Sequence, residues 1–390
     1  MKVVCTGGGT GGHTLPVLAV IKALKRADEN LEIVFVGSNF GIESKLVPKI
    51  GIKYYGISTG KFRRYHRSKI LNIIDPTTFF KNVSDFFKFL SGIKDSKRIL
   101  ELENPDVIFA KGGFVSLPVG VSARILKIPL IVHESDVVMG LANKKLASFA
   151  EKVCVSFDSK YYKDYVDDEK IKETGNPVRD DVFMGSGDKF KKNIDFSDKK
   201  KTLLILGGSQ GSRFINNLIL EKVEKIIDDW QIIWIAGDRD LELVKHKISS
   251  LNTSERKKIK VFGFLTSEMA DVYAASDLVV SRAGSNVLFE LAALGKPTIL
   301  IPFDESAGGH QLENAKIFSR NGAAYLFKQD SINSSALLHQ LRYLNENEDE
   351  LKSMSRAMQK MSDVGASEKI AKLIIELGKK KIEQTRENKE

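Results

Sequence analysis

Near its start the chain passes from a short apolar strand straight into a glycine loop and then into a helix. The strand is Val3–Cys5, the loop reads GGGTGGH as far as His13, and the helix is expected from Pro16. The same order recurs at Leu203, where the strand LLIL is followed by the loop GGSQG. Glycines let the backbone approach a ligand closely, and N–H groups at a helix start attract anions. Two such units predict an α/β chain with two Rossmann-like parallel-sheet domains, which we expect to face each other across a cleft.

Length and composition fit two domains. The chain has 390 residues, of which 42% are hydrophobic and 28% charged, so the apolar mass suffices for two cores. We expect the N-terminal domain over residues 1–177 and the C-terminal domain over 178–366. A helix at about 367–378 is expected to pack back on the N-terminal domain, and the charged tail at 379–390 is expected to be frayed.

The charge balance and the cysteines narrow the class of protein. A formal net charge of +10 predicts an anionic partner, and nucleic acid, anionic lipid and phosphorylated substrates all fit it. No recognition helix, zinc-finger spacing or aromatic RNA-binding signature occurs, which argues against nucleic acid. Cys5 and Cys154 lie in apolar runs, which favours a reducing cytosol over a disulfide scaffold. The apolar run after Met1 stops at Gly7, too early for a signal peptide or a membrane span.

The first glycine loop also satisfies the dinucleotide pattern through Gly7, Gly9 and Gly12. In nicotinamide enzymes that pattern is joined by an acid at the end of the second strand. Here the second strand, Ile33–Val36, is followed by glycine and serine. The sequence therefore argues against a nicotinamide cofactor.

The stretch from Ser281 to Ala315 has the features of a nucleotide-sugar pocket. A strand end turns into a helix at Ser285, and the turn places N–H groups and the positive helix end where a diphosphate can sit. Glu290 lies just over one turn inside this helix, where its carboxylate can accept two neighbouring ribose hydroxyls. After a second strand and a glycine-rich loop, Gln311 offers neutral groups for a sugar. The alternative is an ordinary, well-capped βαβ unit.

A second set of polar side chains follows the strands of the N-terminal domain. The strand at 130–132 leads into His133, Glu134, Ser135 and Asp136, and the motif KGGFVS follows the strand at 105–109. The carboxyl ends of parallel strands are where open α/β sheets bind ligands. The alternative is a polar, capped loop. His13, at the mouth of the first glycine loop, is either a base or a capping residue.

The segment KFRRYHRSK at 61–69 sets five basic residues around two aromatic ones, and an apolar segment with helical spacing follows it. The helix contains Phe79, Phe80, Phe86 and Phe87. A solvated loop before a crossover helix explains this pattern. So does a membrane contact in which basic residues meet anionic headgroups and phenylalanines dip below them.

Asp238-Arg239-Asp240 is spaced like the metal-binding triplet of other sugar transferases. Because it follows a strand and Gly237, turn chemistry explains it better. We therefore expect no metal site there.

Taken together, the motifs resemble the MurG-type transferases, that is UDP-N-acetylglucosamine–N-acetylmuramyl-(pentapeptide) pyrophosphoryl-undecaprenol N-acetylglucosaminyltransferases. GGGTGGH, KGGFVS, HESD, TGNPVR, GGSQGS, FGFL, SRAGSNVLFE and HQLENA fall in the order and spacing of that family. The resemblance implies the GT-B fold and an inverting hexosyltransferase that moves GlcNAc from UDP-GlcNAc to lipid I, giving lipid II for peptidoglycan. It also implies that no cofactor is required, and a peripheral place on an anionic membrane surface at the cytoplasmic face of the cell membrane.

The resemblance also assigns residues. The family's donor contacts map onto Thr10, Gly11, Gly12, Arg179, Ser209, Leu265, Ser285, Asn286, Val287, Leu288, Phe289, Glu290 and Gln311. His13 and Glu134 match polar residues that face the acceptor in the family. Among the base candidates we rank His13 first, Glu134 second and Asp136 third. The better-known form of the fourth motif is His-Glu-Gln-Asn, so Asp136 either repels the diphosphate or acts as an acid–base group.

Three rival functions remain at this point. The first is another GT-B transferase with a different lipid acceptor. A UDP-GlcNAc 2-epimerase uses the same fold without a lipid acceptor, and the basic segment at 61–69 argues against it. A non-catalytic scaffold that binds nucleotide sugar at the membrane is disfavoured by the retained donor motifs and base candidates.

Overall fold

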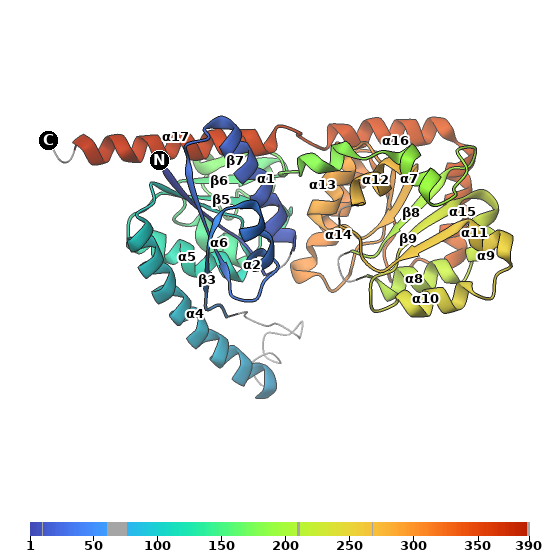
Figure 1. Ribbon diagram of the computed structural model, residues 1–390, viewed down its shortest axis with the longest axis horizontal. Coiled ribbons are helices and arrows are strands. Elements are labelled where there is room, and N and C mark those ends of the chain that lie inside the picture. Colours follow the sequence, from blue (N-terminus) through green and yellow to red (C-terminus); the bar gives the residue numbers. More distant parts are fainter. Residues whose placement is uncertain (10, 61–75, 209–210, 267, 388–390) are drawn as a thin grey trace. The chain divides into compact units, whose positions relative to one another are not determined.

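The computed structural model describes residues 1–9, 11–60, 76–208, 211–266 and 268–387, with the backbone alone at 76–81 and 307. The chain forms two α/β units (Figure 1). The N-terminal unit comprises Met1–Pro177 together with Val364–Glu390, and the C-terminal unit comprises Val178–Asp363. Each unit has its own parallel sheet and its own buried apolar cluster.

The sheet of the N-terminal unit has the strand order β3-β2-β1-β4-β5-β6-β7, and all its pairings are parallel. The strands are β1 Lys2–Thr6, β2 Glu32–Ser38, β3 Lys53–Ile57, β4 Val107–Ala110, β5 Leu130–Glu134, β6 Lys152–Val155 and β7 Ile171–Glu173. The order reverses between β1 and β4, so the loops after these two strands diverge at the carboxyl edge. Ligands of open α/β sheets bind at such a point.

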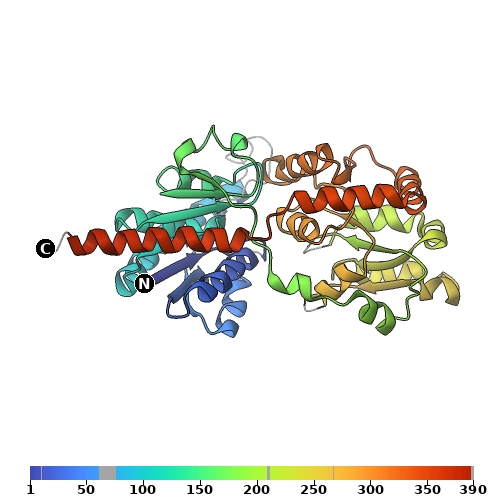
Figure 2. The ribbon, with the colours of Figure 1, turned by 90° about the horizontal axis from the view of Figure 1, so that it is seen from above.

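Helices cover both faces of this sheet, with α4 and α17 on opposite sides (Figure 1). The helical segments of the unit are α1 Gly11–Ala27, α2 Glu43–Leu46, η1 Pro48–Ile50, α4 Pro76–Glu103, α5 Gly113–Ile125, α6 Leu141–Ala147, η2 Ser159–Tyr161, η3 Asp168–Lys170 and α17 Ala366–Glu387. Helix α17 runs along α1 (Figure 2), and its Ile370 and Ile374 join Val3 and Cys5 in one buried cluster. The last helix of the chain thus completes the core of the first unit.

Two helix boundaries differ from the sequence predictions. Helix α1 begins at Gly11 rather than Pro16, because the glycines that end the loop already adopt helical geometry and Pro16 is accommodated inside the helix. Helix α17 continues to Glu387, so the prediction of a frayed tail from residue 379 is wrong over most of its length. Lys, Glu, Gln and Arg are good helix formers, and they extend an anchored helix without further burial.

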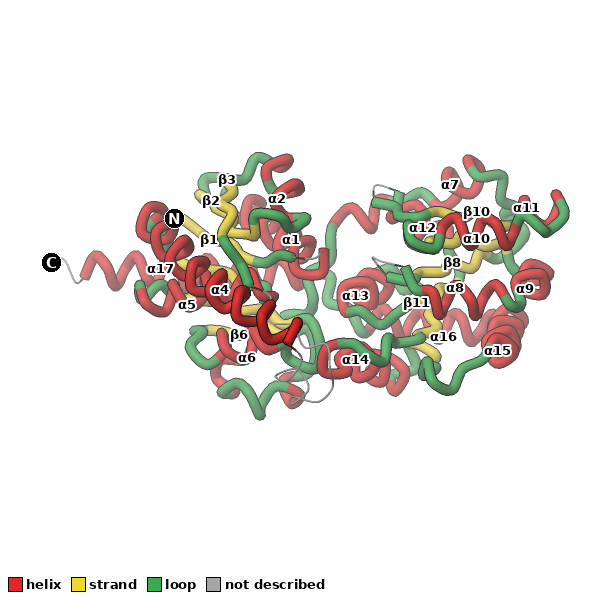
Figure 3. Tube along the Cα trace, turned by 90° about the horizontal axis from the view of Figure 1, so that it is seen from below, coloured by secondary structure: helices red, strands yellow, loops and turns green. Residues whose placement is uncertain are grey.

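The sheet of the C-terminal unit has the order β10-β9-β8-β11-β12-β13, again parallel throughout. Its strands, yellow in Figure 3, lie among red helices. The strands are β8 Thr202–Leu206, β9 Gln231–Ile235, β10 Ile259–Phe262, β11 Leu278–Ser281, β12 Thr298–Leu300 and β13 Ala324–Leu326. The helical segments are η4 Asp180–Met184, α7 Gly187–Asn193, α8 Arg213–Leu220, α9 Val223–Asp229, α10 Leu241–Ile248, α11 Thr253–Lys257, α12 Met269–Ala275, α13 Ser285–Ala293, η5 Ala307–Gly309, α14 His310–Arg320, α15 Ser334–Glu346 and α16 Glu348–Lys360.

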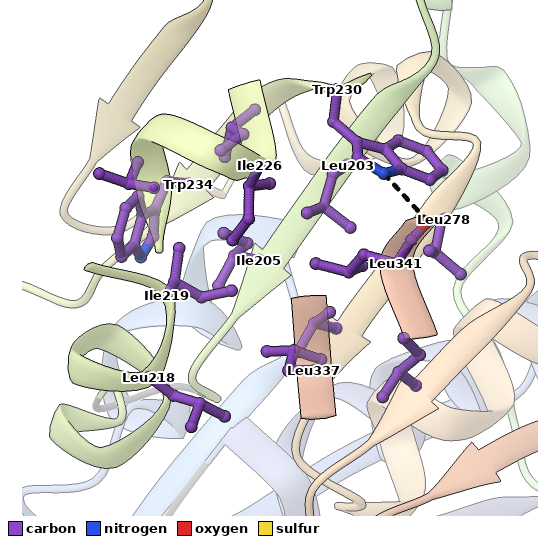
Figure 4. Close-up of a cluster of buried hydrophobic side chains, with 14 of the residues drawn as sticks. Leu203, Ile205, Leu218, Ile219, Ile226, Trp230, Trp234, Leu278, Leu337 and Leu341 are labelled. Carbon is purple, nitrogen blue, oxygen red and sulfur yellow. Dashed lines mark hydrogen bonds between the residues drawn. The ribbon is translucent and has the colours of Figure 1, made fainter. Parts of the chain in front are cut away.

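The core of the C-terminal unit contains two fully buried tryptophans (Figure 4). A buried indole N–H needs an acceptor. Trp230 donates to the Leu341 carbonyl at 3.3 Å, and Trp234 donates to Asn216 Oδ1 at 2.9 Å. These bonds tie β9 and its preceding turn to α15 and α8, so the loop after β8 is built on a fixed scaffold.

Candidate active site

The first glycine loop rests on a buried carboxylate that sequence analysis did not single out. Glu43, on α2, accepts from the Gly9 N–H with 3.1 and 3.0 Å to its two oxygens, and from the Ser38 N–H at 3.1 Å and hydroxyl at 2.6 Å. A Cβ at Gly8 would lie 2.2 Å from a Glu43 oxygen, and one at Gly41 would lie 2.1 Å away. A side chain at either position would displace the Glu43 carboxylate from these hydrogen bonds. The Gly9 N–H already has a protein acceptor.

His13 lies in the first turn of α1, with its ring close to the KGGFVS motif. A Cβ at Gly113 would come within 2.9 Å of His13 Cδ2. Burial, and then the charge of Lys111, lower the pKa of His13 to about 4, against the opposing effect of Asp136. Within the described part of the chain its Nδ1 has no hydrogen-bond partner. The imidazole is therefore neutral at neutral pH, and its Nδ1 is a buried nitrogen without a described partner.

Glu134 ends β5 and has its carboxylate surrounded by donors. Oε1 accepts from the backbone N–H groups of Ser135 and Asp136 at 2.8 and 3.0 Å. Oε2 accepts from the Gly140 N–H and from Asn143 Nδ2, both at 2.9 Å. Burial, and then the charge of Asp136, raise the pKa of Glu134. With four donors on a buried carboxylate, this residue holds the loop between β5 and α6 in place.

Lys111 is a buried cation beside these acids, and sequence analysis gave it no role of its own. Its ammonium donates to Ser135 Oγ at 2.5 Å, and the Ser135 hydroxyl in turn donates to Asn176 Oδ1. Burial lowers the pKa of Lys111 to about 8, and Glu134 and Asp136 oppose that shift. His133, by contrast, is fully buried and donates from Nε2 to the Gly175 carbonyl at 2.9 Å, so its ring belongs to the sheet. Asp136 is half-buried at the carboxyl edge.

In the C-terminal unit the glycine loop lies next to a buried guanidinium. Arg282, directly after β11, donates to the carbonyls of Ile301 and Pro302 at 3.0 Å each and to Ser212 Oγ at 2.8 Å. Phe303 stacks near the same group, with its ring centroid 5.4 Å from the guanidinium carbon. Burial lowers the pKa of Arg282 to about 10, which leaves it a cation at neutral pH. Ser212 is the N-cap of α8, so this cation lies at the helix that follows the loop.

Helix α13 begins at Ser285, as predicted, and carries Glu290 inward. The Glu290 carboxylate is buried and accepts from the Tyr273 hydroxyl at 2.9 Å on Oε2 and from Arg179 Nε at 3.4 Å on Oε1. Arg179 also bonds Asp181 at 3.2 Å. Burial raises the pKa of Glu290, and the charge of Arg179 opposes the shift. The structure thus places the two predicted donor contacts Glu290 and Arg179 within hydrogen-bond distance of each other. It also shows that Tyr273 is a second partner of Glu290.

The remaining predicted donor contacts differ in their surroundings. Leu288 and Phe289 have core side chains, so only their backbone is available to a ligand. Gln311 accepts from the Phe303 N–H at 3.0 Å, which places it at the loop after β12. The half-buried group at loop ends and helix starts is Gly11, Asn286, Val287 and Leu265, while Gly12 is exposed and Ser285 buried. Thr10 and Ser209 lie outside the described residues, as does the basic segment at 61–69.

In the triplet Asp238-Arg239-Asp240, the last acid is engaged in protein contacts and the first two residues are exposed. Asp240 is buried and accepts from Arg213 Nε at 2.7 Å and from Asn216 Nδ2 at 3.0 Å. Among the described residues, no group of three or more His, Cys, Asp or Glu side chains is arranged to hold a metal ion. The turn interpretation of this triplet is consistent with these contacts.

The sequence of the chain matches two family models and many known relatives. The model of the glycosyltransferase family 28 N-terminal domain matches residues 3–155, and that of the C-terminal domain matches residues 202–374. A Clostridium botulinum UDP-N-acetylglucosamine--N-acetylmuramyl-(pentapeptide) pyrophosphoryl-undecaprenol N-acetylglucosamine transferase is 40% identical over 347 residues, 89% of this chain and 91% of the relative. The Clostridium perfringens protein of the same name is 39% identical over 366 residues, 93% of this chain and 94% of the relative.

Solved structures agree on the fold. Acinetobacter baumannii MurG superposes with a TM-score of 0.71 at 24% identity, covering 96% of this chain and 99% of that one. A Neisseria meningitidis UDP-GlcNAc 2-epimerase bound to UDP-GlcNAc superposes with a TM-score of 0.67 at 17% identity, covering 96% of this chain and all (100%) of that one. The predicted GT-B fold is thereby confirmed, and it is shared with epimerases. On sequence identity over most of its length, the chain belongs to the UDP-N-acetylglucosamine--N-acetylmuramyl-(pentapeptide) pyrophosphoryl-undecaprenol N-acetylglucosamine transferases of glycosyltransferase family 28.

Proposed function

We propose that this chain is an inverting hexosyltransferase that moves GlcNAc from UDP-GlcNAc to the muramyl 4-hydroxyl of lipid I. The product is lipid II, the precursor of peptidoglycan, so the activity serves wall growth, cell shape and division. Relatives that carry this activity in their name match about nine tenths of the chain at 39–40% identity. The epimerases share only the fold with it, at 14–17% identity.

One observation supports the division of labour between the two units. The charged side chain hydrogen-bonded at the first glycine loop is the acid Glu43, and the one hydrogen-bonded after the second loop is the cation Arg282, although Lys111 is also a buried cation in the N-terminal unit. A diphosphate dianion is favoured next to Arg282, whereas Arg179, on the same unit, is already paired with Glu290 and Asp181. The first loop has the Glu43 carboxylate beneath it, and Glu134 and Asp136 lie at the same sheet edge. This surrounding suits a hydroxyl that must lose a proton better than it suits a diphosphate. We therefore assign UDP to the C-terminal unit and the acceptor hydroxyl to the N-terminal unit.

The proposed chemistry is a single displacement. The muramyl 4-oxygen bonds to the anomeric carbon of GlcNAc while the bond from that carbon to the diphosphate oxygen breaks, with inversion to a β-1,4 link. His13, whose Nδ1 lacks a protein partner in the described structure, takes the hydroxyl proton. Arg282, Arg179 and the N-terminus of α13 stabilise the charge that develops on UDP. Because four donors already engage Glu134, we assign it to positioning the β5–α6 loop and keep Asp136 as the second base candidate.

We also propose that this neutralisation needs no metal ion, because cationic side chains and helix N–H groups supply it. Asp240 is committed to Arg213 and Asn216. Activity in EDTA should then equal activity in Mg²⁺. A complete loss that Mg²⁺ reverses would contradict this part of the proposal and return attention to the acidic triplet.

Membrane attachment is the remaining part of the proposed function, on the cytoplasmic face of the cell membrane. Helix α4 exposes an apolar stripe at helical spacing, formed by Val83, Phe86, Phe87 and Leu90. Phe87 is 65% exposed, which leaves most of its ring in contact with water unless something covers it. No helix in the described residues is long and apolar enough to cross a bilayer. A stripe of this kind, preceded in the chain by the basic segment at 61–69, suits peripheral contact with anionic lipid.

Radiolabelled UDP-GlcNAc, incubated with and without a short-chain lipid I analogue, tests the reaction. Transfer of label to the lipid is expected, with stoichiometric release of UDP. UDP release without label in the lipid would favour an epimerase. Binding of UDP-GlcNAc with neither product would favour a non-catalytic scaffold.

Vesicle cosedimentation tests the membrane contact. The double variant Phe86→Ser/Phe87→Ser should bind anionic vesicles at least about tenfold more weakly, because burying a phenylalanine contributes about 1.5–3 kcal/mol. Leu102→Ser, an exposed leucine near the other end of α4, is the matched control. Equal losses in both variants would show that α4 has no specific membrane face.

A further inference from the structure

Glu290 is tied to a second helix by one short contact. Tyr273, on α12, donates its hydroxyl to Glu290 Oε2 at 2.9 Å, and both side chains are buried. Arg179 Nε lies 3.4 Å from the other oxygen, Oε1. The carboxylate is therefore held at both oxygens, once by a neutral hydroxyl from α12 and once by the cation that begins the C-terminal unit.

The orientation of this carboxylate decides what it can bind. The last torsion of a glutamate side chain is a broad, nearly two-fold rotor, so burial alone does not fix the plane of the group. Each carboxylate oxygen can accept two hydrogen bonds, and the protein partners above occupy one direction on each. The described protein groups thus leave one acceptor position on each oxygen, which is the number that two adjacent donating hydroxyls require. A vicinal cis-diol, as in ribose, has this arrangement.

We propose that Tyr273 is a positioning residue that orients the Glu290 carboxylate for a ribose diol and so makes the site selective for ribonucleotides over 2′-deoxyribonucleotides. This inference rests on the proposed function, in which Glu290 accepts the ribose hydroxyls of UDP-GlcNAc. Tyr273 touches no substrate in it. The hydroxyl acts only through Glu290, and the phenyl ring belongs to the core of the unit.

The electrostatics are consistent with this role. Burial, and then the charge of Glu290, raise the pKa of Tyr273 well above its ordinary value, so the hydroxyl remains a donor throughout the working pH range. For Glu290 burial raises the pKa, while the hydrogen bond from Tyr273 and the charge of Arg179 lower it. Removing the hydroxyl should therefore also raise the pKa of Glu290. In that variant Glu290 would be protonated at a higher pH than in the unmodified protein. During acidification, the affinity for UDP-GlcNAc would therefore begin to fall at a higher pH.

The test compares UDP-GlcNAc with its 2′-deoxyuridine analogue in the intact protein. Tyr273→Phe keeps the ring and removes the hydroxyl. We expect KM for UDP-GlcNAc to rise about five- to tenfold with kcat nearly unchanged, because one hydrogen bond to a charged group is lost. KM for the 2′-deoxy analogue should change much less, so the preference for ribose should fall. The acid limb of 1/KM should move to higher pH.

Tyr325→Phe is the matched control, because Tyr325 also donates to a glutamate, Glu350, at 3.0 Å in the same unit. It should leave the ribose preference intact. Glu290→Ala separates the two levels of inference. One outcome is that Glu290→Ala raises KM for UDP-GlcNAc and abolishes the preference for ribose, whereas Tyr273→Phe changes neither quantity. In that case the proposed donor site stands, but Tyr273 has no positioning role. If Glu290→Ala leaves KM for UDP-GlcNAc unchanged, the proposed donor site itself is wrong.

Discussion

In the N-terminal unit the loop after β1 rests on the Glu43 carboxylate, whereas in the C-terminal unit the loop after β8 lies beside the Arg282 guanidinium. The two loops have the same backbone device. Each contains a glycine with φ of +84°, Gly9 in one and Gly208 in the other, which places both in a conformation that other residues rarely adopt. Each is followed by a helix that begins within a few residues, α1 or α8.

We infer from this difference that a glycine loop specifies a backbone path, and that the groups behind the loop decide which ligand it favours. Glu43 binds the Gly9 N–H that would otherwise be available to a phosphate. Arg282 engages carbonyls and the Ser212 hydroxyl, and its positive charge is not neutralised by a carboxylate within hydrogen-bond distance in the described residues. Under the proposed function, two copies of one supersecondary unit would hold a hydroxyl and a diphosphate in one enzyme.

The largest expected effect comes from Arg282→Met, which removes the cation of the C-terminal loop. Ser212 Oγ and two buried carbonyls lose their donor, at a cost of about 1–3 kcal/mol for each group left unsatisfied. We expect a lower midpoint of urea unfolding and UDP binding weakened about 100-fold by calorimetry. Arg282→Lys keeps the charge without the planar fork, so it should recover part of the UDP affinity. If Arg282→Met bound UDP as tightly as the unmodified protein, the Arg282 cation would have no role in UDP binding.

The complementary change in the N-terminal loop is Glu43→Gln. The amide must turn an N–H toward Gly9 or Ser38, where the carboxylate accepted, so the loop shifts. We expect kcat with a lipid I analogue to fall about tenfold while calorimetric UDP affinity stays unchanged. If Glu43→Gln weakened UDP binding as strongly as Arg282→Met, the proposed separation of acceptor and donor between the two units would be wrong.

Sequence reasoning found the two loops but neither supporting group. Strands β1 and β8, and the helix start at Ser285, carry local signals, namely apolar runs that end in glycine or serine. The short, partly exposed strands β3 and β13 lack such a run and were not predicted. Glu43 reaches Gly9 across a sequence separation of 34, and Tyr273 reaches Glu290 across 17. Such pairings depend on how strands and helices pack, which periodicity along one segment does not contain.

The protonation of His13 can be followed through the pH dependence of kcat, and it depends on the charges around the first glycine loop. As a base His13 must be neutral, and its pKa is lowered to about 4 by burial and Lys111, so the acid limb of kcat should lie near that value and well below 6.5. Lys111→Met removes a neighbouring positive charge that disfavours the imidazolium. The acid limb should then move to higher pH, with the maximal rate reduced only a few-fold. A limb that stays in place in Lys111→Met, or a full rate retained in His13→Ala, would exclude His13 as the base.

The smallest effect is expected at a buried acid that has nothing to do with either loop. Glu103, at the end of α4, accepts from Lys53 Nζ at 2.7 Å, from the Tyr55 hydroxyl at 2.6 Å and from Lys2 Nζ at 3.1 Å. Burial alone would raise its pKa, but these hydrogen bonds outweigh burial and lower the pKa from 4.5 to about 2. A depressed pKa in the folded state means that the stabilisation is fully present above the unfolded pKa near 4.5. It is lost as the pH falls from there through about 2.

Glu103→Gln should therefore lower the free energy of unfolding at neutral pH by only about 1 kcal/mol, because the partner lysines are in contact with water and screen the pairs. The difference from the unmodified protein should shrink toward zero as urea unfolding is repeated at pH values approaching 2. Since Glu103 and Glu43 are both buried acids of the N-terminal unit, Glu103→Gln also calibrates the acceptor-side effect. If kcat is unchanged in Glu103→Gln and falls about tenfold in Glu43→Gln, the loss in Glu43→Gln comes from the loop. If kcat falls equally in the two variants, the loss of activity only reflects the lower stability of the N-terminal unit.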